Sequence, residues 1–275
     1  MPVTLDRREG PYGEVVLRQR DDHFEIIANG TFLMDTSDGR SERLLVDAAL
    51  QALKGRGDRS AGGTRARTAD AGDSRTARAD GPGTGHAGDA RATDANADAD
   101  AEAPTDAGDG RRPSVLIGGL GVGFSLAHAA ADPSWGRIAV VEREQAIIDW
   151  HRAGPLAALS GSALADPRTT LIHADLVAYV HDPDVSDTYD ALCLDIDNGP
   201  DWTVTEGNDS LYSPAGLAAC ARRLNSGGVL AVWSARPSAD FEESLRNAGF
   251  TGVRTEEIPV ARGVPDVVHL GVRPA

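Results

Sequence analysis

Large apolar residues are missing from one long internal segment of this 275-residue chain. From Lys54 to Ser114 there is no Val, Ile, Leu, Met, Phe, Trp, Tyr or Cys, and the segment consists mostly of Ala, Asp, Gly, Arg and Thr. Such a composition cannot bury enough apolar surface to offset the entropy that is lost on ordering. We therefore predict a disordered linker over residues 54–112, between a small unit, 1–53, and a larger unit, 113–275.

Metal-binding patterns and long apolar runs are also missing. Cys193 and Cys220 lie inside apolar runs, and neither the cysteines nor the scattered histidines have the spacing of metal ligands or of a nucleophilic triad. No apolar run approaches the length of about 18 residues that a membrane helix needs, and the N-terminus has no hydrophobic signal segment. These absences predict a soluble cytoplasmic protein that binds neither a metal nor a membrane.

Basic residues are too few to balance the acids. The formal charge is −15, and residues 113–275 contribute −10 of it, from 11 basic and 21 acidic side chains. A strongly acidic domain repels phosphate backbones, so we do not expect a nucleic-acid partner. The same charge would attract a small cationic substrate such as an amine; the alternative is that it only keeps the protein soluble.

Alternating apolar residues and turn signals predict a small antiparallel sheet in the first unit. We expect strands at 12–18, 24–27 and 31–35, with Asn29-Gly30 as a hairpin turn. Helical spacing of apolar residues follows over 41–53, with Ser41 as the N-cap.

In the larger unit, predicted strands and helices alternate, which indicates a parallel sheet with right-handed crossovers. An α/β fold of the methyltransferase type (Rossmann-like) follows: a mostly parallel seven-stranded sheet, preceded by the small N-terminal antiparallel β domain. The ligand should lie over the carboxyl ends of the strands. The expected strands are 114–118, 138–142, 169–173, 190–196, 228–233, 250–258 and 265–272, the last two forming an antiparallel pair, and the expected helices are 123–131, 144–158, 213–224 and 238–248.

A glycine-rich turn follows the first of these strands. Its glycines are Gly119, Gly121 and Gly123, and such turns let backbone N–H groups approach a nucleotide closely. A dinucleotide fingerprint would have Gly or Ala at the next position, where this chain has Phe124. We therefore favour a sulfonium nucleoside such as S-adenosylmethionine (AdoMet) over NAD; a plain strand-to-helix turn is the alternative.

Acidic residues end the next strands. Glu142 comes about 20 residues after the turn, where an acid typically binds ribose hydroxyls. Asp175 follows the third strand and could accept a hydrogen bond from an adenine amino group, or could cap the helix that follows. Asp195 and Asp197 end the fourth strand on one face, where one carboxylate could act as a base, although capping or loop roles are the alternatives. Trp202, Asn208 and Tyr212 follow and could line a substrate pocket or pack within the loop.

These residues together resemble the spermidine synthase family of polyamine aminopropyltransferases. The resemblance rests on the N-terminal meander with Tyr12-Gly13 and Asn29-Gly30, the acid Glu42, the turn Gly118–Gly123, Val141-Glu142, Asp175 and Asp195. It implies that decarboxylated AdoMet is the co-substrate, with Glu142 on its ribose and Asp175 on its adenine, and that the protein forms a homodimer or a tetramer. It also implies that Asp195 is the general base that activates an amine, and that Asp197, Asn198, Trp202 and Tyr212 lie near the acceptor.

The sequence also departs from the family's pattern. Val122 stands where the family has the acid that recognises the aminopropyl end of decarboxylated AdoMet, and Asn198 replaces the second acid of an Asp-x-x-Asp motif. Our leading prediction is a spermidine-synthase-like transferase that alkylates an amine. The alternatives are an AdoMet-dependent methyltransferase of small molecules, which Val122 favours, and a non-catalytic sensor of nucleosides or polyamines.

Overall fold

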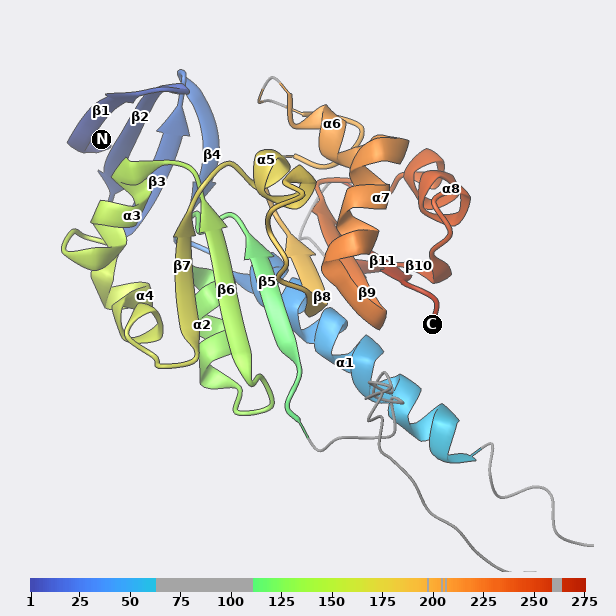
Figure 1. Cartoon of the computed structure of the whole chain (residues 1–275). Helices are drawn as coiled ribbons and strands as arrows, with labels where there is room; N and C mark the ends of the chain where they lie inside the picture. Colours follow the sequence, from blue (N-terminus) through green and yellow to red (C-terminus); the bar gives the residue numbers. More distant parts are fainter. Residues whose placement is uncertain (63–110, 197, 204, 206, 259–263) are drawn as a thin grey trace, which may run out of the picture. The chain divides into compact units, whose positions relative to one another are not determined.

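A computed structural model of the chain describes residues 1–62, 111–196, 198–203, 205, 207–258 and 264–275. The chain divides into one compact unit made of 1–59 with 111–275 and a second unit, 60–110. Both predicted sheets belong to the first unit, which is described below (Figure 1). Of the second unit, the structure describes the end of one helix.

The N-terminal sheet is antiparallel and has the strand order β1-β2-β3-β4. The structure adds a first strand that the sequence analysis did not predict, because none of its residues is buried and no apolar alternation marks it. This strand is held by its pairing with β2 and by a hydrogen bond of 2.8 Å from the indole N–H of Trp150 to Asp6. The strands are β1 (Val3–Gly10), β2 (Gly13–Arg20), β3 (His23–Ala28) and β4 (Thr31–Asp35).

A long helix, α1 (Arg40–Gly62), follows this sheet. Its apolar face includes Leu45 and Ala49, which are fully buried. The helix packs against strand β8 (Tyr189–Leu194), where the carbonyl oxygen of Leu45 is 3.9 Å from the sulfur of Cys193. The helix extends nine residues beyond the predicted end at Leu53, into the segment predicted as a linker. Residues 63–110 of that segment lie outside the described residues.

The larger sheet has seven strands in the order β10-β11-β9-β8-β5-β6-β7, which confirms the predicted fold class. The five strands from β9 to β7 run parallel, and the C-terminal hairpin adds an antiparallel pair at one edge. The strands are β5 (Ser114–Gly118), β6 (Arg137–Glu142), β7 (Thr169–His173), β8 (Tyr189–Leu194), β9 (Leu224–Ser234), β10 (Thr251–Ile258) and β11 (Asp266–Val272).

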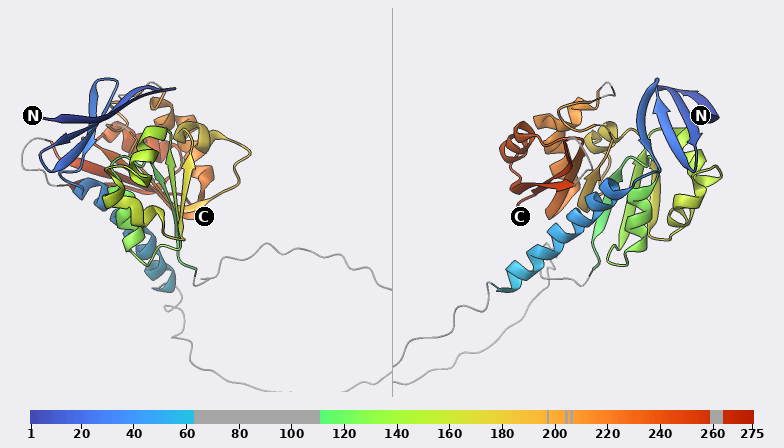
Figure 2. Two further views of the ribbon diagram at one scale, coloured as in Figure 1. Left: turned by 90° about the vertical axis from the view of Figure 1, so that its left-hand side faces the viewer. Right: turned by 180° about the vertical axis from the view of Figure 1, so that it is seen from behind.

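Helices cover both faces of this sheet, as Figures 1 and 2 show. Side chains of β5 and β8 alternate between two cores: Val115, Ile117 and Cys193 pack with α1, α2 and α3, whereas Leu116 and Leu192 pack with α5, α7 and α8. Burial on both faces is why these central strands have nearly continuous apolar sequences. The helices are α2 (Phe124–Ala131), α3 (Gln145–Arg152), α4 (Ala157–Leu164), α5 (Leu176–His181), α6 (Asp209–Tyr212), α7 (Pro214–Arg223) and α8 (Ala239–Asn247).

One predicted helix is two helices in the structure. The sequence analysis expected a single helix over 144–158, but α3 ends at Arg152, Ala153 leaves the helical conformation, and α4 starts at Ala157. Pro155 explains the break, since a proline disfavours the helical conformation in the residue before it and cannot donate a backbone hydrogen bond. The break matters for function because it brings α4 back beside the glycine turn.

Candidate active site

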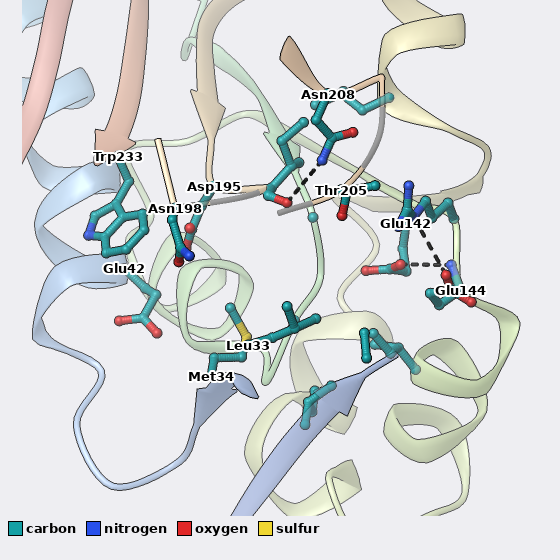
Figure 3. A pocket seen from close by; sticks show the side chains of 18 of the residues that line it. Leu33, Met34, Glu42, Glu142, Glu144, Asp195, Asn198, Thr205, Asn208 and Trp233 are labelled. Atoms are coloured by element: carbon teal, nitrogen blue, oxygen red, sulfur yellow. Dashed lines mark hydrogen bonds and ion pairs between the residues drawn. The ribbon is translucent and has the colours of Figure 1, made fainter. Parts of the chain in front are cut away.

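A cavity of about 370 Å³ lies at the carboxyl ends of β5, β6 and β8, between these ends and strand β4 with the start of α1. This volume lies in the range of sites that bind small molecules, roughly 300–1,000 Å³. Figure 3 shows Glu42, Asp195, Asn198 and Trp233 at one end of the cavity, and Glu142 and Glu144 at the other. The two ends are called the acidic–tryptophan end and the Glu142 end below.

The glycine turn forms part of the wall through Gly119 and Gly121. Gly119, Gly121 and Gly123 have φ angles of 92°, 51° and 95°, which disfavour any residue with a side chain. A Cβ atom would also meet Asp195 O at 2.7 Å from position 119, and Met34 Sδ at 2.4 Å from position 121. The close approaches that require glycine here are thus to other parts of the protein.

Glu142, the last residue of β6, is 6% exposed and lines the cavity. Its Oε2 accepts a hydrogen bond of 2.9 Å from Leu120 N, and its Oε1 accepts one of 2.7 Å from Glu144 N. Burial raises the pKa of this carboxyl, while the backbone donors counteract the rise. The strand end and the glycine turn therefore hold Glu142 in one orientation.

Asp175 lies next to the Glu142 end and also lines the cavity. Its Oδ1 accepts a hydrogen bond of 2.9 Å from Ala178 N and caps helix α5, which is one of the two roles that the sequence allowed. Arg143, whose guanidinium lies 3.9 Å from Asp175 Oδ2 and over the ring of Tyr12 at 4.4 Å, faces the same space. A nucleobase bound here would meet both the carboxylate of Asp175 and the guanidinium of Arg143.

Asp195 directly follows β8 and lines the acidic–tryptophan end of the cavity. Burial raises the pKa of its carboxyl to about 8, and the negative charges of Glu42 and Asp266 add to the effect. Burial also raises the pKa of Glu42, which lies in the first turn of α1. Three carboxyl groups from distant parts of the sequence thus share one end of the cavity, and a positive charge there would lower the pKa of each.

The sequence analysis did not identify Asp266 or Trp233 as site residues, although both line the cavity. Asp266 begins the antiparallel strand β11 and accepts a hydrogen bond of 2.9 Å from the hydroxyl of Ser41. Because β11 runs opposite to the parallel strands, its first residue lies at the edge where those strands end. The sequence analysis predicted that this strand is antiparallel, and its direction alone could have placed Asp266 beside the ends of the parallel strands.

The remaining predicted residues divide between cavity, core and surface. Asn198 and Asn208 line the cavity, and Asp197 lies outside the described residues. Tyr212 is 8% exposed and packs edge-on against Phe241 at 5.6 Å between ring centroids, whereas Trp202 is 58% exposed. Neither aromatic side chain is among the described residues that line the cavity.

Carboxyl groups far outnumber basic groups among the described residues that line the cavity. Among the described lining residues, Arg143 is the single basic side chain, and it lies near Glu144 and Asp175. In the part of the chain that the structure describes, no group of three His, Cys, Asp or Glu side chains is arranged to hold a metal ion. The arrangement suits an organic cation. The acidic lining residues are Asp35, Asp38, Glu42, Glu142, Glu144, Asp175, Asp195 and Asp266.

The sheet order and the position of the cavity define an α/β protein of the methyltransferase type with a small N-terminal β-sheet. No protein-family model matches the sequence, and a search of curated proteins finds no match. Within the described residues, no helix has the length and apolar character needed to span a membrane.

Solved structures identify the fold more closely. The chain is similar to spermidine synthase from Thermotoga maritima, with a TM-score of 0.62 and 13% identity, over 98% of this chain and 73% of that one. It is also similar to a spermidine synthase in complex with the transition-state analogue AdoDATO, with a TM-score of 0.61 and 13% identity, over 98% of this chain and 72% of that one. The chain therefore has a spermidine-synthase-like fold.

Proposed function

We propose that the protein is a transferase that alkylates a small amine with a sulfonium nucleoside, and that the donor is decarboxylated AdoMet. The observation that carries the proposal is the set of three carboxyl groups, Glu42, Asp195 and Asp266, at one end of a cavity in a spermidine-synthase-like fold. One of the similar structures binds a transition-state analogue, AdoDATO, which supports a donor of this kind.

The charges favour the decarboxylated donor over AdoMet itself. Decarboxylated AdoMet carries only positive charges at neutral pH, whereas AdoMet adds a carboxylate to its tail. Eight acidic side chains line the cavity, and the one basic residue among the described lining residues, Arg143, lies beside Asp175 at the Glu142 end. A tail carboxylate at the acidic–tryptophan end would lie among three carboxyl groups, and each of these that is ionised would repel it in a site partly shielded from water.

In the proposed reaction, Asp195 accepts the proton of the attacking amine. The amine nitrogen bonds to the carbon next to sulfur, the carbon–sulfur bond breaks, and its electron pair stays on sulfur as a neutral thioether. Deprotonating an amine of pKa about 10 at pH 7 costs roughly 4 kcal/mol. A base works best when its pKa is near that of the operating pH, and the raised pKa of Asp195, about 8, meets this condition.

The Glu142 end is the proposed nucleoside site. Glu142 would accept hydrogen bonds from the ribose hydroxyls, and Asp175 would face the adenine amino group. The glycine turn, through Gly119, Gly121 and Gly123, would form the wall of this site. Asn198 is proposed on the acceptor side, since it lines the cavity, whereas Trp202 and Tyr212 do not. We further expect a cytoplasmic protein and a homodimer or a tetramer, as the resemblance to spermidine synthases implies.

Replacing Asp195 by Asn tests the proposed base. We expect turnover with decarboxylated AdoMet and a panel of amines to fall by at least about 100-fold, the usual contribution of a general base. Calorimetric titration should show that the variant still binds 5′-methylthioadenosine. Unchanged turnover in the variant would overturn the assignment of Asp195.

Methyl transfer from AdoMet is the second candidate, and the residue at position 122 favours it. Val122 is 1% exposed and packs in the core, so this position offers no acid for an aminopropyl group. Mass spectrometry of the products from each donor separates the two reactions. Tight binding of donor and amine without product would instead favour a sensor.

A further inference from the structure

Two buried polar residues that the proposed chemistry does not use lie behind the glycine turn. His151, near the end of α3, and Ser160, in α4, are both 0% exposed. His151 Nε2 is 2.8 Å from the carbonyl oxygen of Gly121, and His151 Nδ1 is 2.6 Å from Ser160 Oγ. Burying these polar groups costs desolvation, which their hydrogen bonds to each other and to Gly121 offset.

The hydrogen-bond directions follow from the acceptor at one end. A carbonyl oxygen only accepts, so His151 Nε2 carries a proton and donates to Gly121. In a neutral imidazole Nδ1 is then an acceptor, and the Ser160 hydroxyl donates to it. Burial lowers the pKa of His151, which favours this neutral form.

The peptide group between Gly121 and Val122 is held at both of its polar atoms. His151 binds its carbonyl, and Val122 N donates to the sulfur of Met34 at 3.1 Å. Gly121 has a φ of 51° and no side chain, so its own torsions fix the peptide only weakly. External partners therefore set how this part of the turn is oriented.

Two backbone N–H groups of the turn, those of Leu120 and Gly121, face Glu142. Leu120 N donates to Glu142 Oε2 at 2.9 Å, and the backbone N–H of Gly121 also contributes to lowering the pKa of that carboxyl. Hydrogen bonds thus join Ser160 to His151 and His151 to the carbonyl of Gly121, and the N–H of the same residue, on the preceding peptide, faces Glu142. The coupling from the His–Ser pair to Glu142 therefore passes through the backbone of Gly121.

We propose that His151 and Ser160 are positioning residues for Glu142: they fix the Gly121–Val122 peptide, and through it the N–H groups that orient the carboxylate toward the ribose. The inference rests on the proposed function, because it takes Glu142 as the ribose-binding residue. It assigns a role to a buried His–Ser pair that touches neither substrate.

The test compares two nucleosides by calorimetric titration: 5′-methylthioadenosine and its 2′,3′-dideoxy counterpart. The ratio of their dissociation constants measures how strongly the protein recognises the ribose hydroxyls. We expect His151→Leu to reduce this ratio by about fivefold, which corresponds to the loss of one ordinary hydrogen bond. His151→Gln, whose amide can donate to Gly121, should restore much of the ratio, and Ser160→Ala should give a smaller loss.

The ratio of dissociation constants distinguishes a positioning role from a general effect on folding. A less well folded variant would bind both nucleosides more weakly and leave the ratio unchanged. A wild-type ratio near one would overturn the role of Glu142 and with it the proposed nucleoside site. A strong wild-type ratio that is unchanged in both His151→Leu and Ser160→Ala would overturn this inference alone. If His151→Leu does not fold, as judged by circular dichroism, Ser160→Ala and His151→Gln decide the outcome.

Discussion

Replacing Asp195 by Asn should stabilise the fold while it removes the proposed base. Burial and two neighbouring acids raise the pKa of this carboxyl from its ordinary 3.8 to about 8. At about 1.4 kcal/mol for each pH unit, the ionised carboxylate costs at most about 6 kcal/mol of folding free energy. The side chain is half-buried and opens onto the cavity, so water screens part of this cost and we expect about 2–3 kcal/mol.

The sign of the pH dependence follows from the raised pKa. The folded state binds the proton more tightly than the unfolded state, so the wild-type protein loses stability as the pH rises from about 4 to about 8. The neutral amide of Asp195→Asn does not titrate, and the stability difference between the two proteins should therefore grow over this range and become constant above about pH 8.

Urea unfolding at pH 5, 7 and 9, followed by circular dichroism, measures this difference. Asp22→Asn is the matched control, because it removes one carboxylate whose side chain is fully exposed. A difference between wild type and Asp195→Asn that stays the same at all three pH values would refute the reasoning. It would mean that Asp195 does not lie in a site that disfavours its charge.

Two further substitutions test the geometry of the site. Gly119→Ala should weaken binding of 5′-methylthioadenosine by at least about tenfold in calorimetric titration, because the new Cβ would meet the backbone oxygen of Asp195 at 2.7 Å and shift the cavity wall. Gly207→Ala, which also has a positive φ but has nothing within 4 Å, is the control. Equal losses in the two variants would contradict the account. Glu42→Gln should shift the acidic limb of the kcat–pH profile to lower pH, since the charge of Glu42 raises the pKa of Asp195; a shift to higher pH would contradict that assignment.

The sequence predicted the fold well where strong local patterns specify it. The continuous apolar run of β5 and the glycines that follow, Gly119 to Gly123, are sufficient to place a glycine turn at the end of a buried strand. Strand β1 was missed because its residues are exposed and its conformation depends on pairing with β2. Helix boundaries near Pro155 were missed because helical periodicity continues on both sides of it.

The acidic–tryptophan end could be predicted only in part. Asp195 was identified because it directly follows a buried strand, and Glu42 because of the family resemblance. Asp266 and Trp233 come to the same cavity through strand order, and no local pattern marks them. The contacts that hold the turn, from Met34 and His151, are long-range packing contacts that a single sequence does not specify.

Side-by-side calorimetric titration with decarboxylated AdoMet and AdoMet tests the central claim most directly. The cavity has eight acidic lining residues and one basic one among those that the structure describes, and so we predict tighter binding of the decarboxylated form, by at least about tenfold. Tighter binding of AdoMet would contradict the account, because the tail carboxylate would then need a binding partner that these acids do not offer. Methyl transfer would in that case be the better-supported function.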